Sequence, residues 1–272
     1  MSKKYSIEDL QYLMSRLRDP ETGCPWDIKQ SFASIVPSTI EEAYEVADTI
    51  ERGDFAHLQE ELGDLLFQVI FYSQLGKEEG LFVWDDVVHG LTKKLVRRHP
   101  HVFPEGTLDS KVTNNDANTE AQIKATWEEI KKEERLQKGS AGVLDDVPVN
   151  LPSLSRAAKL QKRAAKVGFD WADAKQILAK IKEEVAELES EMQAAESSQE
   201  VMDELGDVIF SCVNLARYLN KDPEAIVRAS NRKFEGRFRY IERSLSAAKK
   251  DISETPIEEM ESLWQEAKSE GL

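Results

Sequence analysis

The sequence predicts an all-α fold built from two tandem helical-bundle domains, joined by a linker that contains proline and glycine. Apolar residues recur three and four positions apart along almost the whole chain, which is the period of an amphipathic helix. Runs of β-branched residues long enough for a strand are few. One acidic helical pattern also occurs twice. The 272 residues are therefore expected to hold a duplicated unit of about 130 residues.

The first unit is expected at residues 1–138. Its predicted helices are 6–18, 38–52, 55–76, 84–97 and 118–136, because these stretches carry the helical period. Gly53-Asp54 and Gly80 provide breaks between them. Residues 104–118 are polar and rich in turn formers, so we expect a mobile loop that could close over a ligand.

Residues 139–152 form the expected linker, because two glycines and two prolines separate the helical patterns there. The second unit is then expected at 153–272. Its predicted helices are 153–167, 173–193, 198–220, 222–248 and 256–270. Asp222-Pro223 has the pattern of a helix N-cap followed by proline at the first helical position. The two units match helix for helix.

Composition excludes several classes of protein. The net charge of −15 disfavours a nucleic-acid partner, because such partners are bound largely by Lys and Arg. The N-terminal residues do not resemble a signal peptide, and no apolar run is long enough to span a bilayer, so we expect a cytoplasmic protein without a membrane partner. Cys24 and Cys212 are too few for a disulfide framework or a cysteine metal site.

Each copy of the acidic pattern combines two groups of carboxylates. The first copy reads EEAYE at 41–45 and EELGD at 60–64, and the second reads EEVAE at 183–187 and DELGD at 203–207. Carboxylates three or four residues apart share one helix face, and two such faces make an oxygen cage of the kind that Mg²⁺ or Mn²⁺ prefers. The predicted metal ligands are Glu42, Glu45, Glu61 and Asp64 in the first unit and Glu184, Glu187, Glu204 and Asp207 in the second.

A solvated helix face would explain a single acidic group, because the chain has 51 acidic residues. Asp64 and Asp207, however, stand directly before the apolar runs LLF and VIF, where an unpaired carboxylate would carry a desolvation cost. We also expect the apolar residues between the carboxylates to face the core of the bundle. The lack of an accompanying histidine disfavours a di-iron site.

A basic element follows each acidic pattern. Lys94 and Arg98 in the first unit correspond to Lys233 and Arg237 in the second, and each pair shares a helix face. Such a pair either neutralises an acidic bundle or binds phosphate oxygens that a metal does not reach. Both interpretations stay open at this point.

A tryptophan near the end of each unit is followed one turn later by a lysine, as Trp127 and Lys131 and as Trp264 and Lys268. A helical tryptophan commonly belongs to a core, but beside a phosphate site it could stack on a base or cover the pocket. Carboxylates, metal, basic pair and planar aromatic together predict a site for a metal-bound nucleotide polyphosphate.

These motifs resemble the MazG nucleoside triphosphate pyrophosphohydrolases of the all-α NTP pyrophosphatase superfamily, over nearly the whole chain. The resemblance depends on EExxE followed by ELGD in both units, on RRHPHVF at 97–103, and on the junction at 142–171. It implies Mg²⁺-dependent hydrolysis of nucleoside triphosphates to monophosphate and pyrophosphate, by homodimers of tandem helical domains. It further implies that the C-terminal unit carries the main activity, with broad base specificity, and that the site there contains the acidic cage with Lys233, Arg237, Trp264 and Lys268.

The two units differ in one positively charged side chain beside the EExxE pattern. Lys180 stands one turn before the second EExxE, whereas Ser38 occupies the corresponding position of the first. We therefore expect the second unit to be the principal catalyst, with Lys180 in contact with substrate, and the first to be weak, regulatory or chiefly dimerising. Lys233 and Arg237 would stabilise charge in the transition state. Glu183 is the candidate general base, although Glu184 or Glu187 could equally orient the water.

Two other classes of function compete with hydrolysis. One is a nucleotide-sensing or partner-binding helical module without turnover, which the repeated cage would also fit. The other is a purely structural helical repeat with solvated acidic stripes, which the number of recurring elements disfavours. In each case a symmetric dimer is the expected assembly.

Overall fold

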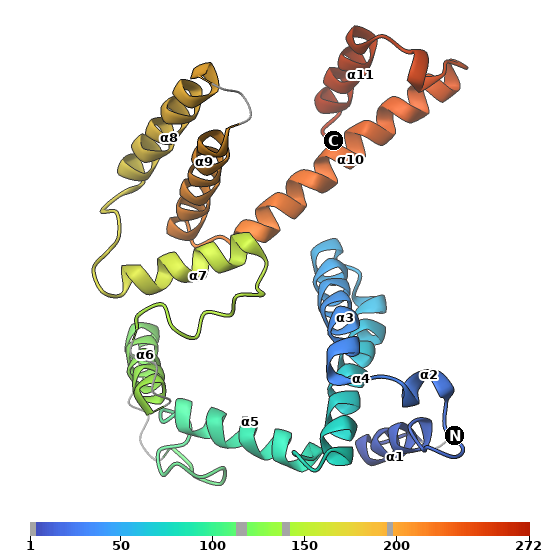
Figure 1. Cartoon of the computed structure of the whole chain (residues 1–272), viewed down its shortest axis with the longest axis vertical. Helices are drawn as coiled ribbons and strands as arrows, with labels where there is room; N and C mark the ends of the chain where they lie inside the picture. The colour runs from blue at the N-terminus through green and yellow to red at the C-terminus, as the bar shows by residue number, and fades with distance from the viewer. Residues whose placement is uncertain (1–3, 113–118, 138–141, 195–197) are drawn as a thin grey trace. The chain divides into compact units, whose positions relative to one another are not determined.

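The computed structural model describes residues 4–112, 119–137, 142–194 and 198–272 (Figure 1). Every regular element in these ranges is a helix, which confirms the all-α prediction. The chain divides into two compact units, Met1–Lys132 and Glu133–Leu272, and the division falls inside α6 (Glu120–Gln137). The expected domain limits and linker stay predictions, and the parts of the predicted loop and linker at 113–118 and 139–141 lie outside the described residues.

The first unit follows the predicted helix order with one addition. Its further elements are α1 (Ile7–Leu17), α2 (Pro25–Ile28), α3 (Phe32–Arg52), α4 (Phe55–Glu78) and α5 (Trp84–Arg98). The short α2 was not predicted. The predicted start of α3 at residue 38 was wrong, because the helix begins before Pro37. Ser31 caps it, with the amide of Ser34 donating to the Ser31 hydroxyl at 3.3 Å and the amide of Ser31 donating to the Ser34 hydroxyl at 2.8 Å.

The turn between α3 and α4 holds the two acidic helices of the first unit side by side. Gly53 has a φ of +70°, a left-handed conformation that glycine adopts without steric cost, and it ends α3. Asp54 then caps α4 by accepting a hydrogen bond from the amide of His57. The break predicted at Gly53-Asp54 is confirmed.

A core cluster in the first unit joins α1, α3 and α4. Its buried members are Met14, Ile35, Ile70, Phe71 and Leu75. They come from the end of α1, the start of α3 and the second half of α4, so this end of the α3–α4 hairpin is fixed by packing. The carboxylates lie toward the other end of the hairpin, nearer the α3–α4 turn.

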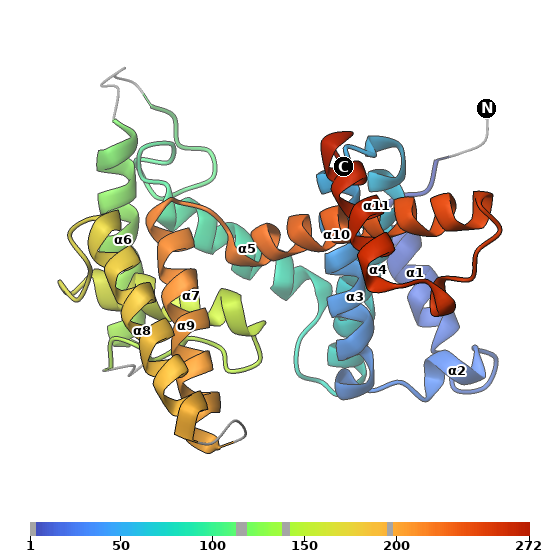
Figure 2. The same cartoon turned by 90° about the horizontal axis from the view of Figure 1, so that it is seen from above.

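The second unit contains α7 (Ser153–Ala165), α8 (Ala174–Ala194), α9 (Gln199–Tyr218), α10 (Pro223–Ala247), the short 3₁₀ helix Ile252–Glu254 and α11 (Ile257–Ser269). Figures 1 and 2 show α8 and α9 side by side as an antiparallel hairpin. The side-chain amide nitrogen Nε2 of Gln161 on α7 donates to the backbone carbonyl of Phe210 on α9 at 2.9 Å. The cap predicted at Asp222 is confirmed, since its carboxylate accepts from the amides of Glu224 and Ala225.

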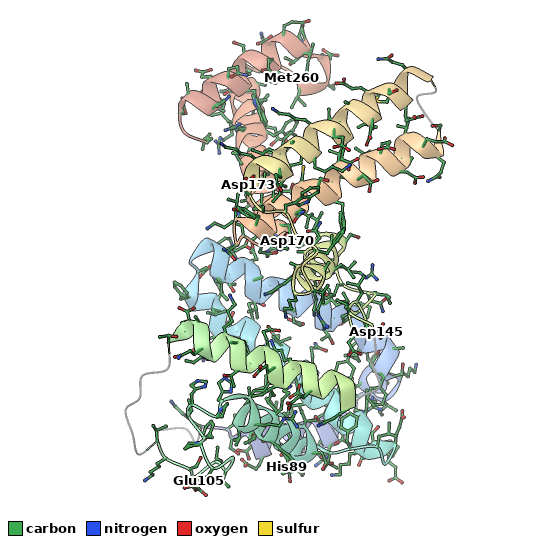
Figure 3. The ribbon with its side chains drawn as sticks, turned by 90° about the vertical axis from the view of Figure 1, so that its left-hand side faces the viewer. His89, Glu105, Asp145, Asp170, Asp173 and Met260 are labelled. Atoms are coloured by element: carbon green, nitrogen blue, oxygen red, sulfur yellow. The ribbon has the colours of Figure 1, made fainter. Side chains whose placement is uncertain are left out.

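The loop before α8 is tied to α9 by an arginine. Asp170, labelled in Figure 3, accepts two hydrogen bonds from the guanidinium of Arg217, one of them at 3.1 Å. Asn214 accepts from the same guanidinium at 2.7 Å. A bidentate pair of this kind fixes orientation as well as distance, so the entry to α8 is held against α9.

The apolar residues between the carboxylates were expected to face a core, and this prediction was wrong for several of them. Leu62 is 49% exposed, Val185 is 38% exposed and Leu205 is 41% exposed. A helix packed against only one neighbour buries one stripe, and these side chains lie outside that stripe. A single chain therefore leaves part of each acidic hairpin's apolar surface uncovered.

No helix among the described residues is both long enough and apolar enough to cross a membrane.

Candidate functional site

Three carboxylates of the second unit converge where α8 packs against α9. One oxygen from each of Glu184, Glu204 and Asp207 lies within 4.8 Å of the other two. Glu184 is only 6% exposed, Glu204 is half-buried and Asp207 is exposed. Oxygens around one Mg²⁺ lie about 3–4 Å apart, since each bond is about 2.1 Å long. The donor set and its spacing thus fit a hard divalent cation, and we call these three residues the C-terminal acidic cluster.

Glu187, the fourth predicted ligand of this unit, lies beside the cluster rather than in it. A hydrogen bond with Glu184 raises the pKa of Glu187, as do desolvation and the nearby charge of Glu204, while Lys180 opposes them. The hydrogen bond places the carboxyl of Glu187 next to that of Glu184. A cation bound to the cluster would replace the shared proton, and Glu187 could then act as a further ligand.

Lys180 on α8 bridges two of the acidic residues. Its ammonium nitrogen lies 2.7 Å from Glu183 and 2.9 Å from Glu184. The hydrogen bond to Glu183, and then that to Glu184, raise the pKa of Lys180 well above its ordinary value. Glu183 is exposed and stands outside the three converging carboxylates, as expected of a residue next to the cage.

The first unit has its own acidic cluster, with a different membership. Here Glu42, Glu45 and Glu61 converge within 4.8 Å, and we call them the N-terminal acidic cluster. Desolvation raises the pKa of Glu42, and the charges of Asp64, Glu45 and Glu61 raise it further. Asp64 is therefore a close neighbour of the cluster. The two clusters are not equivalent, because the residue left outside is Asp64 in one unit and Glu187 in the other.

The desolvation argument made for Asp64 and Asp207 was wrong, since both side chains are exposed. The aspartate precedes the apolar run in sequence but points off the stripe that the run buries. The second glutamate of each EExxE is less exposed than these aspartates: Glu184 is buried and Glu42 is half-buried.

Sequence reasoning missed Gln68, which contacts the N-terminal acidic cluster. This side chain is 6% exposed, and its amide nitrogen donates to Glu42 at 3.5 Å. Its amide oxygen is buried without a hydrogen-bond partner. The available signal was a polar residue inside LLFQVIF, one turn beyond Asp64 on the same helix face.

The basic and aromatic residues of the second unit gather on the α10–α11 hairpin. The guanidinium of Arg237 lies 5.4 Å from the ring centroid of Trp264, and its Nε donates to the carbonyl of Leu272 at 2.7 Å. Phe234, which sequence reasoning missed, lies 5.3 Å from the Trp264 ring between centroids. Lys233 and Lys268 are both exposed on this hairpin.

The corresponding group of the first unit spans α5 and α6. Lys131 Nζ lies 3.9 Å from the ring centroid of Trp127, so the lysine covers one face of that ring. His99 lies 6.0 Å from the same ring between centroids. Lys94 and Arg98 stand near the end of α5. Trp127 therefore pairs with the lysine that follows it, whereas Trp264 pairs with residues of the preceding helix.

The structure does not bring the two halves of the predicted second site together in one chain. Among the described residues, α10 packs mainly against α11 and less extensively against α7 and α9. No hydrogen bond or ion pair in this part of the chain joins the C-terminal acidic cluster to the residues of the basic and aromatic group, which are Lys233, Arg237, Trp264 and Lys268.

Known proteins align with nearly the whole of this chain. The nucleoside triphosphate pyrophosphohydrolase of Escherichia coli (strain K12) is 46% identical over 263 residues, which cover 96% of this chain and 97% of the relative. The nucleoside triphosphate pyrophosphohydrolase/pyrophosphatase MazG of Thermotoga maritima is 39% identical over 262 residues, covering 96% and 95%. The uncharacterized protein YabN of Bacillus subtilis (strain 168) is 44% identical over 264 residues, which are 97% of this chain and 52% of that protein.

The model of the MazG nucleotide pyrophosphohydrolase domain matches the chain twice, at residues 30–103 and 173–241. Each matched range contains one acidic cluster, and the second also contains Lys233 and Arg237. The resemblance drawn from the sequence is thereby confirmed, and this chain belongs to the MazG nucleotide pyrophosphohydrolase family.

Proposed function

We propose that this protein hydrolyses nucleoside triphosphates to the monophosphate and pyrophosphate, with Mg²⁺ or alternatively Mn²⁺ and with broad base specificity. The observation that carries the proposal is the convergence of Glu184, Glu204 and Asp207 within 4.8 Å, beside Lys180 and inside a MazG domain. Relatives that align along nearly their whole length bear the name nucleoside triphosphate pyrophosphohydrolase.

The proposed metal ligands of the catalytic unit are Glu184, Glu204 and Asp207, with Glu187 as a fourth. Carboxylate oxygens are the donors that Mg²⁺ prefers, and the hydrogen bond with Glu184 that raises the pKa of Glu187 keeps this carboxyl next to the cluster. A bound cation would supply charge neutralisation at the phosphates and acidify a water molecule.

The chain's own residues position the other reactants. Glu183 accepts a hydrogen bond from Lys180 at one carboxylate oxygen, and we assign its other oxygen to the proton of the attacking water. The water oxygen bonds to the α-phosphorus as the bond to the bridging oxygen of the β-phosphate breaks. That bridging oxygen leaves with the pyrophosphate.

Positive side chains then meet the negative charge of the triphosphate. Lys180, Lys233, Arg237 and Lys268 are the proposed phosphate contacts, because charge-assisted hydrogen bonds to phosphate are strong and Arg can make two in parallel. Trp264, with Arg237 on one side of its ring, is the proposed cover for the base. A single planar side chain selects little between bases, which supports broad specificity.

The proposed division of the chain has a weak, regulatory or dimerising domain at 1–138, a linker at 139–152 and the catalytic domain at 153–272. The N-terminal acidic cluster would bind a cation with Asp64 nearby, and Lys94, Arg98, Trp127 and Lys131 would form its basic and aromatic element. It lacks a counterpart of Lys180, since Ser38 stands there. We also propose that the protein is a homodimer.

The test is to incubate purified protein with each common ribonucleoside and deoxyribonucleoside triphosphate, with Mg²⁺ or with chelator, and to separate the products by ion-exchange chromatography. Metal-dependent monophosphate plus pyrophosphate is the expected result. Diphosphate plus phosphate would contradict the proposed bond cleavage. Tight nucleotide binding without any product would favour a sensing module instead.

A further inference from the structure

We propose that the first unit carries a second nucleotide site, which binds a nucleoside monophosphate whose base has an amino group. The site is a cleft between α1, α4 and the start of α5, and we call it the α1–α4 cleft. Its lining residues are distinct from those of both acidic clusters. The inference rests on the proposed function in one respect only, which is that this ligand is also the product of the reaction.

Packed helices give the α1–α4 cleft its shape. Its volume is about 340 Å³, which falls within the range of small-molecule sites in proteins. In Figure 1, α1 lies against the end of α4 at which α5 begins. Ile70 lines the cleft and also belongs to the core cluster, together with Met14 and Phe71. The cleft is therefore a formed site on the helical core rather than a feature of a loop.

Two aromatic rings give the cleft planar walls. Trp84 is half-buried at the start of α5, and Tyr12 is exposed on α1. The hydroxyl of Tyr12 accepts a hydrogen bond from the guanidinium of Arg16 at 3.3 Å, which restrains this ring. Aromatic side chains stack on flat ligands, and every nucleobase has a π-face on which they can pack. A flat aromatic ligand thus fits these walls.

The polar groups of the cleft offer hydrogen-bond acceptors. The hydroxyl of buried Ser73 donates to the carbonyl of Val69 at 2.9 Å, so only the lone pairs of its oxygen remain. The side-chain nitrogen of Gln74 donates to Glu78 at 2.8 Å, which leaves the amide oxygen of Gln74 without a donor among the described residues. Asp85 adds a carboxylate. An amino group in the plane of a base, as in adenine, cytosine or guanine, supplies the donors that match them.

The charges of the cleft fit one phosphate group. Lys77 and Asp85 both line it, and within the described part of the chain neither forms an ion pair. Lys77 can bind a phosphate, with Arg16 beside it, while Asp85 can accept from an amino group or a ribose hydroxyl. The larger negative charge of a triphosphate would exceed these two cations and be repelled by Asp85. This balance of charge favours the monophosphate.

Isothermal titration of the full chain with AMP, in the presence of chelator, tests the proposal. Chelator removes the cation through which the acidic clusters would bind phosphate. We expect a dissociation constant on the order of 10–100 µM, from the affinity per atom that is usual for ligands of this size. Lys77→Ala should weaken binding about tenfold, because one charge-assisted contact is lost. Lys29→Ala is the matched control, since Lys29 is exposed in the same unit and does not line the cleft.

Lys233→Ala tests the alternative location of the ligand. A loss of affinity in Lys233→Ala, with none in Lys77→Ala, would place the monophosphate in the catalytic unit and overturn the proposal. Undetectable binding to the wild-type chain would overturn it as well. Lys77 is exposed, so circular dichroism should show the same helix content in Lys77→Ala as in the wild type.

A matched ligand tests the identity of the base. Inosine 5′-monophosphate lacks the amino group that AMP and GMP carry, so it should bind at least about tenfold more weakly than either. Equal affinities would contradict the assignment of Ser73, Gln74 and Asp85 as acceptors for an amino group.

Photochemical labelling locates the ligand without any variant. 8-Azidoadenosine 5′-monophosphate, activated by light in the presence of chelator, should label peptides that contain Tyr12 or Trp84. Label confined to peptides from residues 173–272 would contradict the proposed site. None of these measurements needs turnover. A protein that binds AMP through Lys77 but releases no monophosphate from a triphosphate would keep this site and lose the proposed function, and hydrolysis without Lys77-dependent binding would do the reverse.

Discussion

The ammonium nitrogen of Lys180 lies 2.9 Å from a carboxylate oxygen of Glu184, the most buried member of the C-terminal acidic cluster. The lysine therefore competes with any cation for this oxygen, while it adds positive charge where the triphosphate would bind. These two effects have opposite signs, so metal binding and nucleotide binding should respond in opposite directions when the lysine is removed.

Replacing Lys180 with Met should tighten the binding of Mg²⁺ alone severalfold, because Glu184 loses its competing partner. The same change should raise the KM for nucleoside triphosphate by about tenfold, the effect of losing roughly one charge-assisted contact. Isothermal titration with Mg²⁺ and steady-state kinetics measure the two quantities. Lys182→Met is the matched control, because Lys182 is exposed on the same helix and forms no ion pair among the described residues. Equal effects of both variants would contradict a specific role for Lys180.

The two acidic clusters should differ in their contribution to turnover. Glu204→Gln, which replaces one cluster oxygen with an amide nitrogen, should reduce kcat/KM by at least about 100-fold. Glu61→Gln makes the same chemical change in the N-terminal acidic cluster and should alter kcat/KM by less than about twofold. Circular dichroism should show the same helix content in both variants. The reverse pattern would make the N-terminal unit the catalyst.

Most of the helices could be predicted from sequence because each is long and strongly periodic. The predicted α4 and α10 agree with the structure within two residues at each end, since Asp54 and Asp222 give clear capping signals. The start of α3 could not be found in this way. The predicted start at residue 38 follows Pro37, whereas the Ser31 and Ser34 hydroxyls cap the helix about one and a half turns earlier.

The candidate site was predicted in composition but not in arrangement. Spacing places carboxylates on one helix face, and three of the four residues predicted for the second cage, Glu184, Glu204 and Asp207, converge in the structure. Spacing along one chain says nothing about how a later helix packs, so it could not show that Lys233 and Arg237 stand on a separate hairpin. The burial predicted for Asp207 was also wrong. Which side chains are buried depends on which stripe of α8 and α9 the neighbouring helix covers.

Arg18 should be a main contributor to the stability of the first unit. Its side chain is 7% exposed, it forms a bidentate pair with Glu78 with the shortest contact at 2.7 Å, and it lies 5.3 Å from the Phe71 ring centroid. Arg18→Ala should lower the free energy of unfolding by about 2–3 kcal/mol, between the values for exposed and buried pairs. Urea denaturation of Arg18→Ala, Glu78→Gln and the double variant measures the coupling. Additive losses would mean that the pair itself contributes nothing.

That contribution should fade in acid. Burial raises the pKa of Glu78, but hydrogen bonds from Arg18 and Gln74 outweigh it and leave the pKa below its ordinary value. A carboxyl with a lowered pKa in the folded state stabilises the protein above its unfolded pKa, and the stabilisation is lost as pH falls. The difference in unfolding free energy between wild type and Arg18→Ala should therefore shrink as pH falls from neutral to about 4.

His57 should titrate above the ordinary pH range for histidine. Its Nδ1 lies 2.6 Å from Asp54, and this hydrogen bond and the aspartate's charge raise the pKa of His57. The resulting stabilisation is fully present below the unfolded pKa of histidine and is lost as pH rises through the folded pKa. Asp54→Asn should bring the pKa of His57 back toward the ordinary value of about 6.5, while asparagine still caps α4.

The chain has four histidines, so imidazole resonances can be followed individually by NMR as pH is varied. The His57 signal, identified by its loss in His57→Gln, should shift its midpoint downward in Asp54→Asn. The signals of the other histidines are the internal control, because only a change confined to the His57 signal reports the Asp54 contact. An unchanged His57 midpoint would mean that solvent screens this exposed pair completely, and that α4 begins with an ordinary cap that is insensitive to histidine protonation.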